Sequence, residues 1–108
     1  MIIEADHYEE VSKQFGATRE NMRSGRSFIE LAIQERFDLV DVEVVEVTTG
    51  TEYRPWIRIK ARKSGIRVIV EQYRDGEDIV VLLHAVIPRD AHTYEAVENL
   101  WKQYRSKA

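Results

Sequence analysis

The most regular pattern of apolar and polar positions in this chain runs from Trp56 to Tyr73. Two alternating runs, each about six residues long, flank the dipeptide Ser64-Gly65. Strict alternation places apolar side chains on one face of a strand and polar side chains on the other. A two-residue turn that contains Gly commonly joins such strands. The pattern therefore predicts an antiparallel hairpin in which Trp56 lies opposite Tyr73 and Arg58 lies opposite Glu71.

One further strand is predicted on each side of this hairpin. Residues 39–47 alternate except at Val44-Val45, which indicates either a β-bulge or a strand end that is apolar on both faces. Residues 79–87 follow an Asp75-Gly76 turn and are apolar on both faces. Because most connections are short, consecutive strands should be neighbours. We expect a four-stranded antiparallel meander with the strand order 1-2-3-4.

Helical periodicity predicts two helices before the sheet and one after it. The first covers residues 6–15 and the last covers residues 91–105, where an apolar stripe is followed by basic residues. The chain has 108 residues, the size of one domain with a single modest core. The predicted fold class is therefore α+β, in one domain over residues 1–108.

The second N-terminal helix has two candidate starts. Thr18 would begin a long helix, whereas Ser24 or Ser27 would begin a shorter one. A long helix would contain Gly25, which costs a helix interior about 1 kcal/mol. We therefore favour a helix over residues 25–37.

Composition places the chain among ordinary globular proteins. Apolar residues make up 44% and charged residues 32%, and the formal net charge is −3. No apolar run approaches the roughly 18 residues that a membrane span needs, and the N-terminal sequence is not that of a secretory signal. We expect a cytoplasmic protein without membrane contact. The absence of cysteine excludes disulfides and thiolate chemistry.

The sequence contains no pattern that is typical of a catalytic or metal site. His7, His84 and His92 are scattered, without the spacing of metal ligands. There is no nucleophile motif, glycine-rich phosphate loop or acidic calcium loop. We expect His84 to lie on the outer sheet face, where a structural role is more common than a catalytic one. No catalytic residue, metal site or cofactor is predicted, and a non-enzymatic function is favoured.

Basic and aromatic residues of the hairpin and its preceding loop form one candidate binding surface. Cations can contact phosphates while aromatic rings stack on bases. Acidic residues on the neighbouring strands would weaken this attraction. A nucleic-acid-binding accessory protein is therefore our alternative function. Its predicted binding residues are Tyr53, Arg54, Trp56, Arg58, Lys60 and Tyr73.

A second basic group lies around the favoured start of the second helix. Arg19, Arg23 and Arg26 follow one another at short intervals there. Free backbone N–H groups at a helix start can hold an anion. A polar loop between helices explains the same pattern, so the anion site is one of two interpretations.

The outer face of the predicted sheet also carries apolar side chains. Ile69, Val80, Leu82 and Val86 would form a continuous patch, which normally marks an interface. Either the last helix or a second chain covers this patch. We favour a symmetric homodimer that pairs sheet against sheet. The function favoured by the sequence is therefore a non-enzymatic interaction module that self-associates through its sheet, and no small-molecule ligand is identified.

Overall fold

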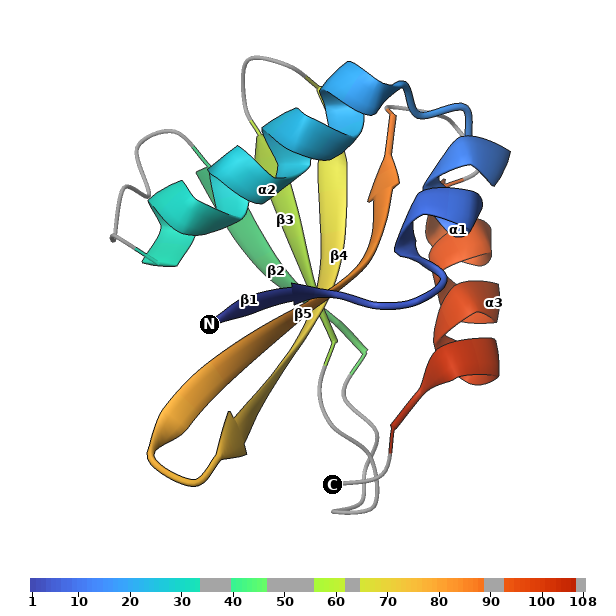
Figure 1. Ribbon diagram of the computed structural model, residues 1–108. Coiled ribbons are helices and arrows are strands. Elements are labelled where there is room, and N and C mark those ends of the chain that lie inside the picture. The colour runs from blue at the N-terminus through green and yellow to red at the C-terminus, as the bar shows by residue number, and fades with distance from the viewer. Residues whose placement is uncertain (34–39, 47–55, 62–64, 89–92, 107–108) are drawn as a thin grey trace.

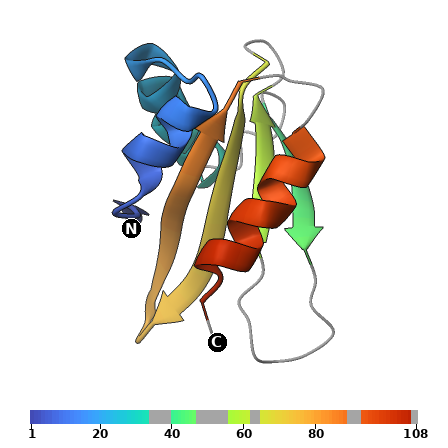
Figure 2. The same cartoon turned by 90° about the vertical axis from the view of Figure 1, so that its right-hand side faces the viewer.

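The chain forms a central sheet with helices on both of its faces (Figures 1 and 2). The computed structural model describes residues 1–33, 40–46, 56–61, 65–88 and 93–106. The elements follow in the order β1 (Ile2–Glu4), α1 (Tyr8–Gln14), α2 (Arg19–Ile33), β2 (Val40–Glu46), β3 (Trp56–Ala61), β4 (Arg67–Asp75), β5 (Asp78–Ile87) and α3 (Thr93–Tyr104). The first and last helices lie within their predicted ranges. Within the described part of the chain, no helix has the length and apolar character needed to span a membrane.

The described strands form one mixed sheet of five strands in the order β1-β5-β4-β3-β2. β1 lies parallel to β5, with Ile2 opposite Val81, and the other three pairs of neighbours are antiparallel. The prediction of a four-stranded antiparallel meander in the order 1-2-3-4 is therefore wrong. Sequence patterning missed β1 because three residues are too few to show alternation. Main-chain pairing holds this strand in place, since the Ala5 N–H donates to the Leu83 carbonyl oxygen at 2.9 Å.

The register of the central hairpin differs from the predicted one. Trp56 lies opposite Glu71, so the pairings of Trp56 with Tyr73 and of Arg58 with Glu71 are both wrong by two residues. The pairing is centred one residue earlier in the chain than the predicted Ser64-Gly65 turn, since Lys60 lies opposite Arg67; residues 62–64 of the connection lie outside the described residues. A shift of two residues leaves each side chain on its predicted face, because side chains alternate with a period of two.

A bulge in β5 changes which core its side chains join. Ile69 lies opposite Ala85 whereas Val70 lies opposite Leu83, so His84 is an extra residue in β5. As a result, Leu83 joins the core on one face and Ala85 joins the core on the other. β2 also has a register shift, between Val44 and Glu46, in agreement with the bulge interpretation of that strand.

The helix α2 begins earlier than predicted. The Thr18 Oγ1 accepts a hydrogen bond from the Asn21 N–H at 3.1 Å, and the Asn21 Oδ1 accepts one from the Thr18 N–H at 3.0 Å. This reciprocal cap selects the long-helix alternative, so the predicted start at residue 25 is wrong. The predicted end at residue 37 lies outside the described residues. Gly25 lies inside the helix because a Cβ there would be 2.5 Å from Cγ2 of Val86. Close packing on the sheet therefore requires the residue that helix propensity disfavours.

Two cores result, one on each face of the sheet. The α2 face buries side chains of α2, β3, β4 and β5, together with Tyr8 of α1. The α3 face buries Trp56, Ile69 and Ala85 against α3, together with Val11 of α1. Figure 2 shows α3 lying across this second face. α1 contributes to both cores, and the Ser12 Oγ accepts a hydrogen bond from the Val86 N–H at 2.9 Å. This hydrogen bond joins α1 to the part of β5 that follows the bulge.

Candidate acid–base site

The predicted nucleic-acid surface does not lie open on the described sheet. Trp56 is fully buried and Arg58 is 3% exposed, so neither side chain is offered to a base or a phosphate in this conformation. Lys60 and Tyr73 are half-buried. Tyr53 and Arg54 lie outside the described residues. Binding of nucleic acid by these residues stays a prediction.

The fold places the residues of the predicted dimer patch on different faces of the sheet. Ile69, Val80 and Val86 are buried within the chain, and Leu82 is half-buried. Ile69 packs in the α3 core, whereas the bulge turns Val86 into the α2 core on the opposite face. These residues therefore do not form one open patch. Self-association itself stays a prediction.

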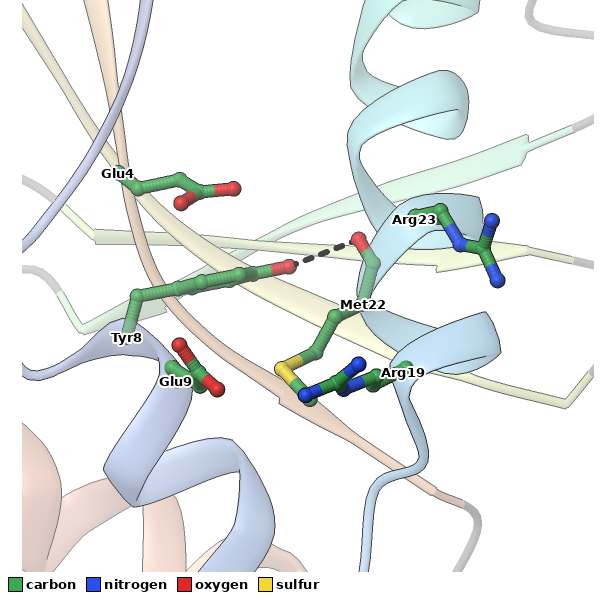
Figure 3. Close-up of a pocket in the computed structure, with 6 residues that line it drawn as sticks. All are labelled: Glu4, Tyr8, Glu9, Arg19, Met22 and Arg23. Atoms are coloured by element: carbon green, nitrogen blue, oxygen red, sulfur yellow. Dashed lines mark hydrogen bonds between the residues drawn. The ribbon is translucent and has the colours of Figure 1, made fainter.

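Two of the three predicted anion-binding arginines line one pocket. Figure 3 shows this pocket of about 490 Å³, which is lined by Glu4, Tyr8, Glu9, Arg19, Met22 and Arg23. The third, Arg26, lies 4.0 Å from the Glu4 carboxylate and 3.9 Å from that of Glu30. The carboxylates balance much of the positive charge, which weakens attraction for a free anion. Anion binding at these arginines stays a prediction.

The Tyr8 hydroxyl in this pocket has a structural contact. It donates a hydrogen bond to the Met22 carbonyl oxygen at 3.1 Å. Burial raises the pKa of Tyr8, the Glu4 carboxylate raises it further, and Arg26 opposes them. The hydroxyl therefore stays protonated and serves as a donor that joins α1 to α2.

Three titratable side chains form a continuous hydrogen-bonded chain on the α3 face of the sheet. The His84 Nε2 lies 3.0 Å from the Glu71 Oε1, and the His84 Nδ1 lies 2.9 Å from the His7 Nε2. Glu71 is fully buried and His84 is 1% exposed, whereas His7 is half-buried. The chain therefore runs from a carboxyl group inside the protein to an imidazole at its surface.

Each member of this chain comes from a different element. Glu71 is on β4, His84 is the extra residue of the β5 bulge, and His7 immediately precedes α1. The bulge keeps His84 and Ala85 on the same face of β5, toward α3. The parallel pairing of β1 with β5 then carries the chain past Ala5 and sets His7 beside His84.

Aromatic rings cover both imidazoles. The ring centroids of Trp56 and His84 are 4.0 Å apart, and the two ring planes make an angle of 17°. The ring centroids of Tyr104 and His7 are 3.7 Å apart, and their planes make an angle of 19°. These contacts exclude water from one side of each imidazole, and an aromatic face also attracts a positively charged ring. Trp56 Nε1 is itself buried and, in the described part of the chain, has no hydrogen-bond partner.

The hydrogen-bond roles in the chain follow from donor chemistry. An ionised Glu71 only accepts, so the His84 Nε2 donates to it; the bare Nδ1 of a neutral His84 then accepts from the His7 Nε2–H. If one proton is added and Glu71 becomes the carboxylic acid, both bonds reverse: Glu71 donates to His84 Nε2, and His84 Nδ1–H donates to His7 Nε2. The proton of His7 is then on Nδ1, at the outer end of the chain. Two complete arrangements therefore exist, and they differ by one proton.

The environment of His7, the imidazole at the outer end of the chain, favours its neutral form. Burial is the main cause that lowers the pKa of His7, a positive charge on His84 lowers it further, and the Asp6 carboxylate opposes both. A neutral imidazole near pH 7 has a lone pair with which to accept a proton. His7 is therefore suited to act as a base at neutral pH.

A groove adjoins this end of the chain. It has a volume of about 460 Å³ and lies between α1 and α3. Its lining residues are Glu10, Val11, Gln14, Phe15, Asn99, Leu100, Gln103 and Tyr104. Tyr104 thus contacts both the groove and His7. The groove combines amide and carboxylate groups with apolar side chains.

Sequence analysis did not find this site because its members are far apart in the chain. His7 and His84 are separated by 77 residues, and neither belongs to a spaced motif. The available signal was the pair Glu71 and His84, two polar residues that each directly follow an apolar run within their strands. Among the described residues, no group of three or more His, Cys, Asp or Glu side chains could hold a metal ion.

Comparison with known proteins finds no relative of this chain. No protein-family model matches the chain, and neither a curated protein nor a solved structure resembles it significantly. Functional inference therefore rests on the geometry of the chain itself.

Proposed function

We propose that this protein is an acid–base catalyst in which His7 exchanges a proton with a bound substrate. His84 and Glu71 are positioning residues, since they act on the substrate only through His7. The single observation that carries the proposal is the continuous chain of hydrogen bonds from the buried Glu71 to the half-buried His7. This observation also revises the non-enzymatic interpretation favoured by the sequence.

The chemistry follows from the two hydrogen-bond arrangements. When His7 takes a proton from the substrate at Nδ1, its Nε2 proton can pass to His84, and the Nε2 proton of His84 can pass to Glu71. The buried carboxylate is then neutral, and no positive charge remains on either imidazole. Because a buried charge is costly unless it is paired, this transfer stabilises the protonated state of the site. Return of the proton reverses each step.

The groove between α1 and α3 is the proposed substrate site. It shares Tyr104 with the ring stack on His7. Its polar and apolar lining is suited to a small organic molecule that carries both hydrogen-bonding groups and an apolar part. Pockets of this kind commonly contain a few polar groups that orient the ligand in an otherwise apolar surface.

The test is the hydrolysis of an activated ester, 4-nitrophenyl acetate, which reports the reactivity of accessible imidazoles without the natural substrate. We expect His7→Gln to lower the rate about tenfold or more, in keeping with the usual contribution of general acid–base groups. Glu71→Gln, which keeps His7, should lower the rate and change its pH profile. The matched control is His92→Gln, which should react like the wild type. Equal rates for His7→Gln and the wild type would overturn the proposal.

A further inference from the structure

The pocket in Figure 3 carries negative charge on one side and positive charge on the other. Its carboxylates are those of Glu4 in β1 and Glu9 in α1, and its guanidinium groups come from the start of α2, at Arg19 and Arg23. Figure 3 shows both carboxylates beside the Tyr8 ring and both guanidinium groups on the side of α2. This separation of charge is complementary to a ligand that carries both signs.

The positive side of the pocket has donors to offer. In the described part of the chain, the guanidinium groups of Arg19 and Arg23 form no ion pair or hydrogen bond. A guanidinium group can bind a carboxylate through two parallel N–H···O bonds. The N-terminal end of α2 adds positive partial charge on the same side. A ligand carboxylate therefore finds both charge and hydrogen-bond donors here.

The negative side of the pocket has acceptors to offer. The Glu9 Oε1 lies 2.8 Å from the Lys13 Nζ. This hydrogen bond and the charge of Lys13 lower the pKa of Glu9, so its carboxylate is ionised at neutral pH. Glu4 lies 4.0 Å from Arg26, which is too long for a hydrogen bond. Since an ionised carboxylate has about four acceptor positions, both groups can still accept N–H bonds from a ligand ammonium group.

The surface between the two charged sides is apolar. The Tyr8 ring is buried, and its hydroxyl already donates to the Met22 carbonyl oxygen. The Met22 side chain also lines the pocket and is half-buried. The volume of about 490 Å³ is sufficient for a molecule of the size of an amino acid. The pocket therefore offers an apolar contact in addition to its two charged contacts.

We propose that this pocket binds a zwitterion, an α-amino acid with an apolar side chain. The ligand carboxylate contacts the two arginines, and the ligand ammonium group contacts the two glutamates. The glutamates repel a simple anion and the arginines repel a simple cation, whereas a zwitterion is attracted by both sides. None of the lining residues belongs to the acid–base chain or to the groove between α1 and α3. The proposal is therefore independent of the proposed catalysis.

Titration of the nitrogen-15-labelled protein with L-leucine, followed through the amide NMR signals of α2, tests this site. Two related molecules each lack one charge, since 4-methylpentanoate has no ammonium group and 3-methylbutylamine has no carboxylate. Because hydrogen bonds to charged groups contribute about tenfold or more to affinity, L-leucine should bind at least about tenfold more tightly than either. Glycine, which lacks the apolar side chain, should also bind more weakly than L-leucine.

Two double variants remove the two sides of the pocket separately. Arg19→Gln/Arg23→Gln removes the positive side, and Glu4→Gln/Glu9→Gln removes the negative side. Each should weaken L-leucine binding about tenfold or more. Glu4→Gln/Glu9→Gln should also bind 4-methylpentanoate more tightly than the wild type does, a gain that a loss of structure could not produce. The matched control is Glu98→Gln, which removes an exposed carboxylate from a similar lysine pair on α3 and should bind L-leucine like the wild type.

The comparison of ligands on the wild type does not depend on the folding of any variant. The proposal is overturned if L-leucine causes no saturable change in the signals of α2. Equal affinity of the wild type for 4-methylpentanoate and L-leucine would also overturn it and would assign the pocket to simple anions. All four substituted positions are exposed, so the double variants should keep well-dispersed spectra. Wild-type affinity for L-leucine in both of them, or an equal loss in Glu98→Gln, would contradict the assignment of the ligand contacts.

Discussion

At the scale of single residues, the protein places its ionisable groups at unequal depth. Glu71 and His84 are buried together, while His7 is half-buried and reaches the surface. A buried carboxyl or imidazole group costs free energy unless it is hydrogen-bonded, and such polar groups rarely add net stability. Groups retained at that cost are candidates for function. The residues themselves were visible in the sequence, but their contact was not, because no local rule brings position 7 to position 84.

The pH dependence of stability tests the environment of His7. Its pKa is lowered in the folded protein, so the unfolded chain binds more protons between that lowered pKa and about pH 6.5. The free energy of unfolding should therefore rise as the pH increases across this window. The contribution of His7 to it should be lost as the pH falls through the same window. The groups that face His7 are His84, with Glu71 behind it, Asp6 and Tyr104.

The measurement is urea unfolding of the wild type and of His7→Gln at intervals between pH 5 and pH 8. His7→Gln should show a smaller loss of stability toward acid than the wild type. Titration of other groups is common to both proteins and cancels in the difference between them. An identical pH dependence of the two proteins would contradict the described environment of His7.

At the scale of elements, alternation and periodicity located four strands and three helices but not their exact pairing. The hairpin register depended on where along the chain the connection is centred, and patterning placed that centre one residue too late. The start of α2 depended on a choice between the Thr18 cap and the low helix propensity of Gly25. Tertiary packing decided this choice, because α2 approaches β5 too closely for any side chain at that position. Local propensity could not include that contact.

Gly25→Ala tests this close approach. Alanine would raise helix propensity by about 1 kcal/mol, but its Cβ would meet Cγ2 of Val86 at 2.5 Å. We expect overpacking to outweigh the gain and lower the free energy of unfolding by about 1–3 kcal/mol. Ser27→Ala, at an exposed position of the same helix, is the control and should change stability little. Chemical denaturation measures both, and a more stable Gly25→Ala would show that α2 and β5 are not in contact there.

At the scale of the whole molecule, function depends on how the layers are assembled. The sequence predicted apolar character on both faces of the last strand but could not decide whether a helix or a second chain covers the outer face. The answer is that α3 covers Trp56 and Ile69, and the same cover encloses the imidazole of His84. β1, invisible to patterning, positions His7 through its parallel pairing with β5. The candidate site is therefore a product of tertiary assembly, whereas the strands that support it were predictable locally.

The central claim, that Glu71 acts on His7 through His84, is tested most directly by nitrogen-15 NMR of the histidine imidazoles during a pH titration. At neutral pH His7 should be neutral and carry its proton on Nε2. Glu71→Gln should move the titration midpoint of His7 to lower pH, because the carboxylate that supports its protonation is gone. His92 should titrate identically in both proteins. The account is contradicted if His7 titrates with the same midpoint in Glu71→Gln and the wild type, or carries its neutral-state proton on Nδ1.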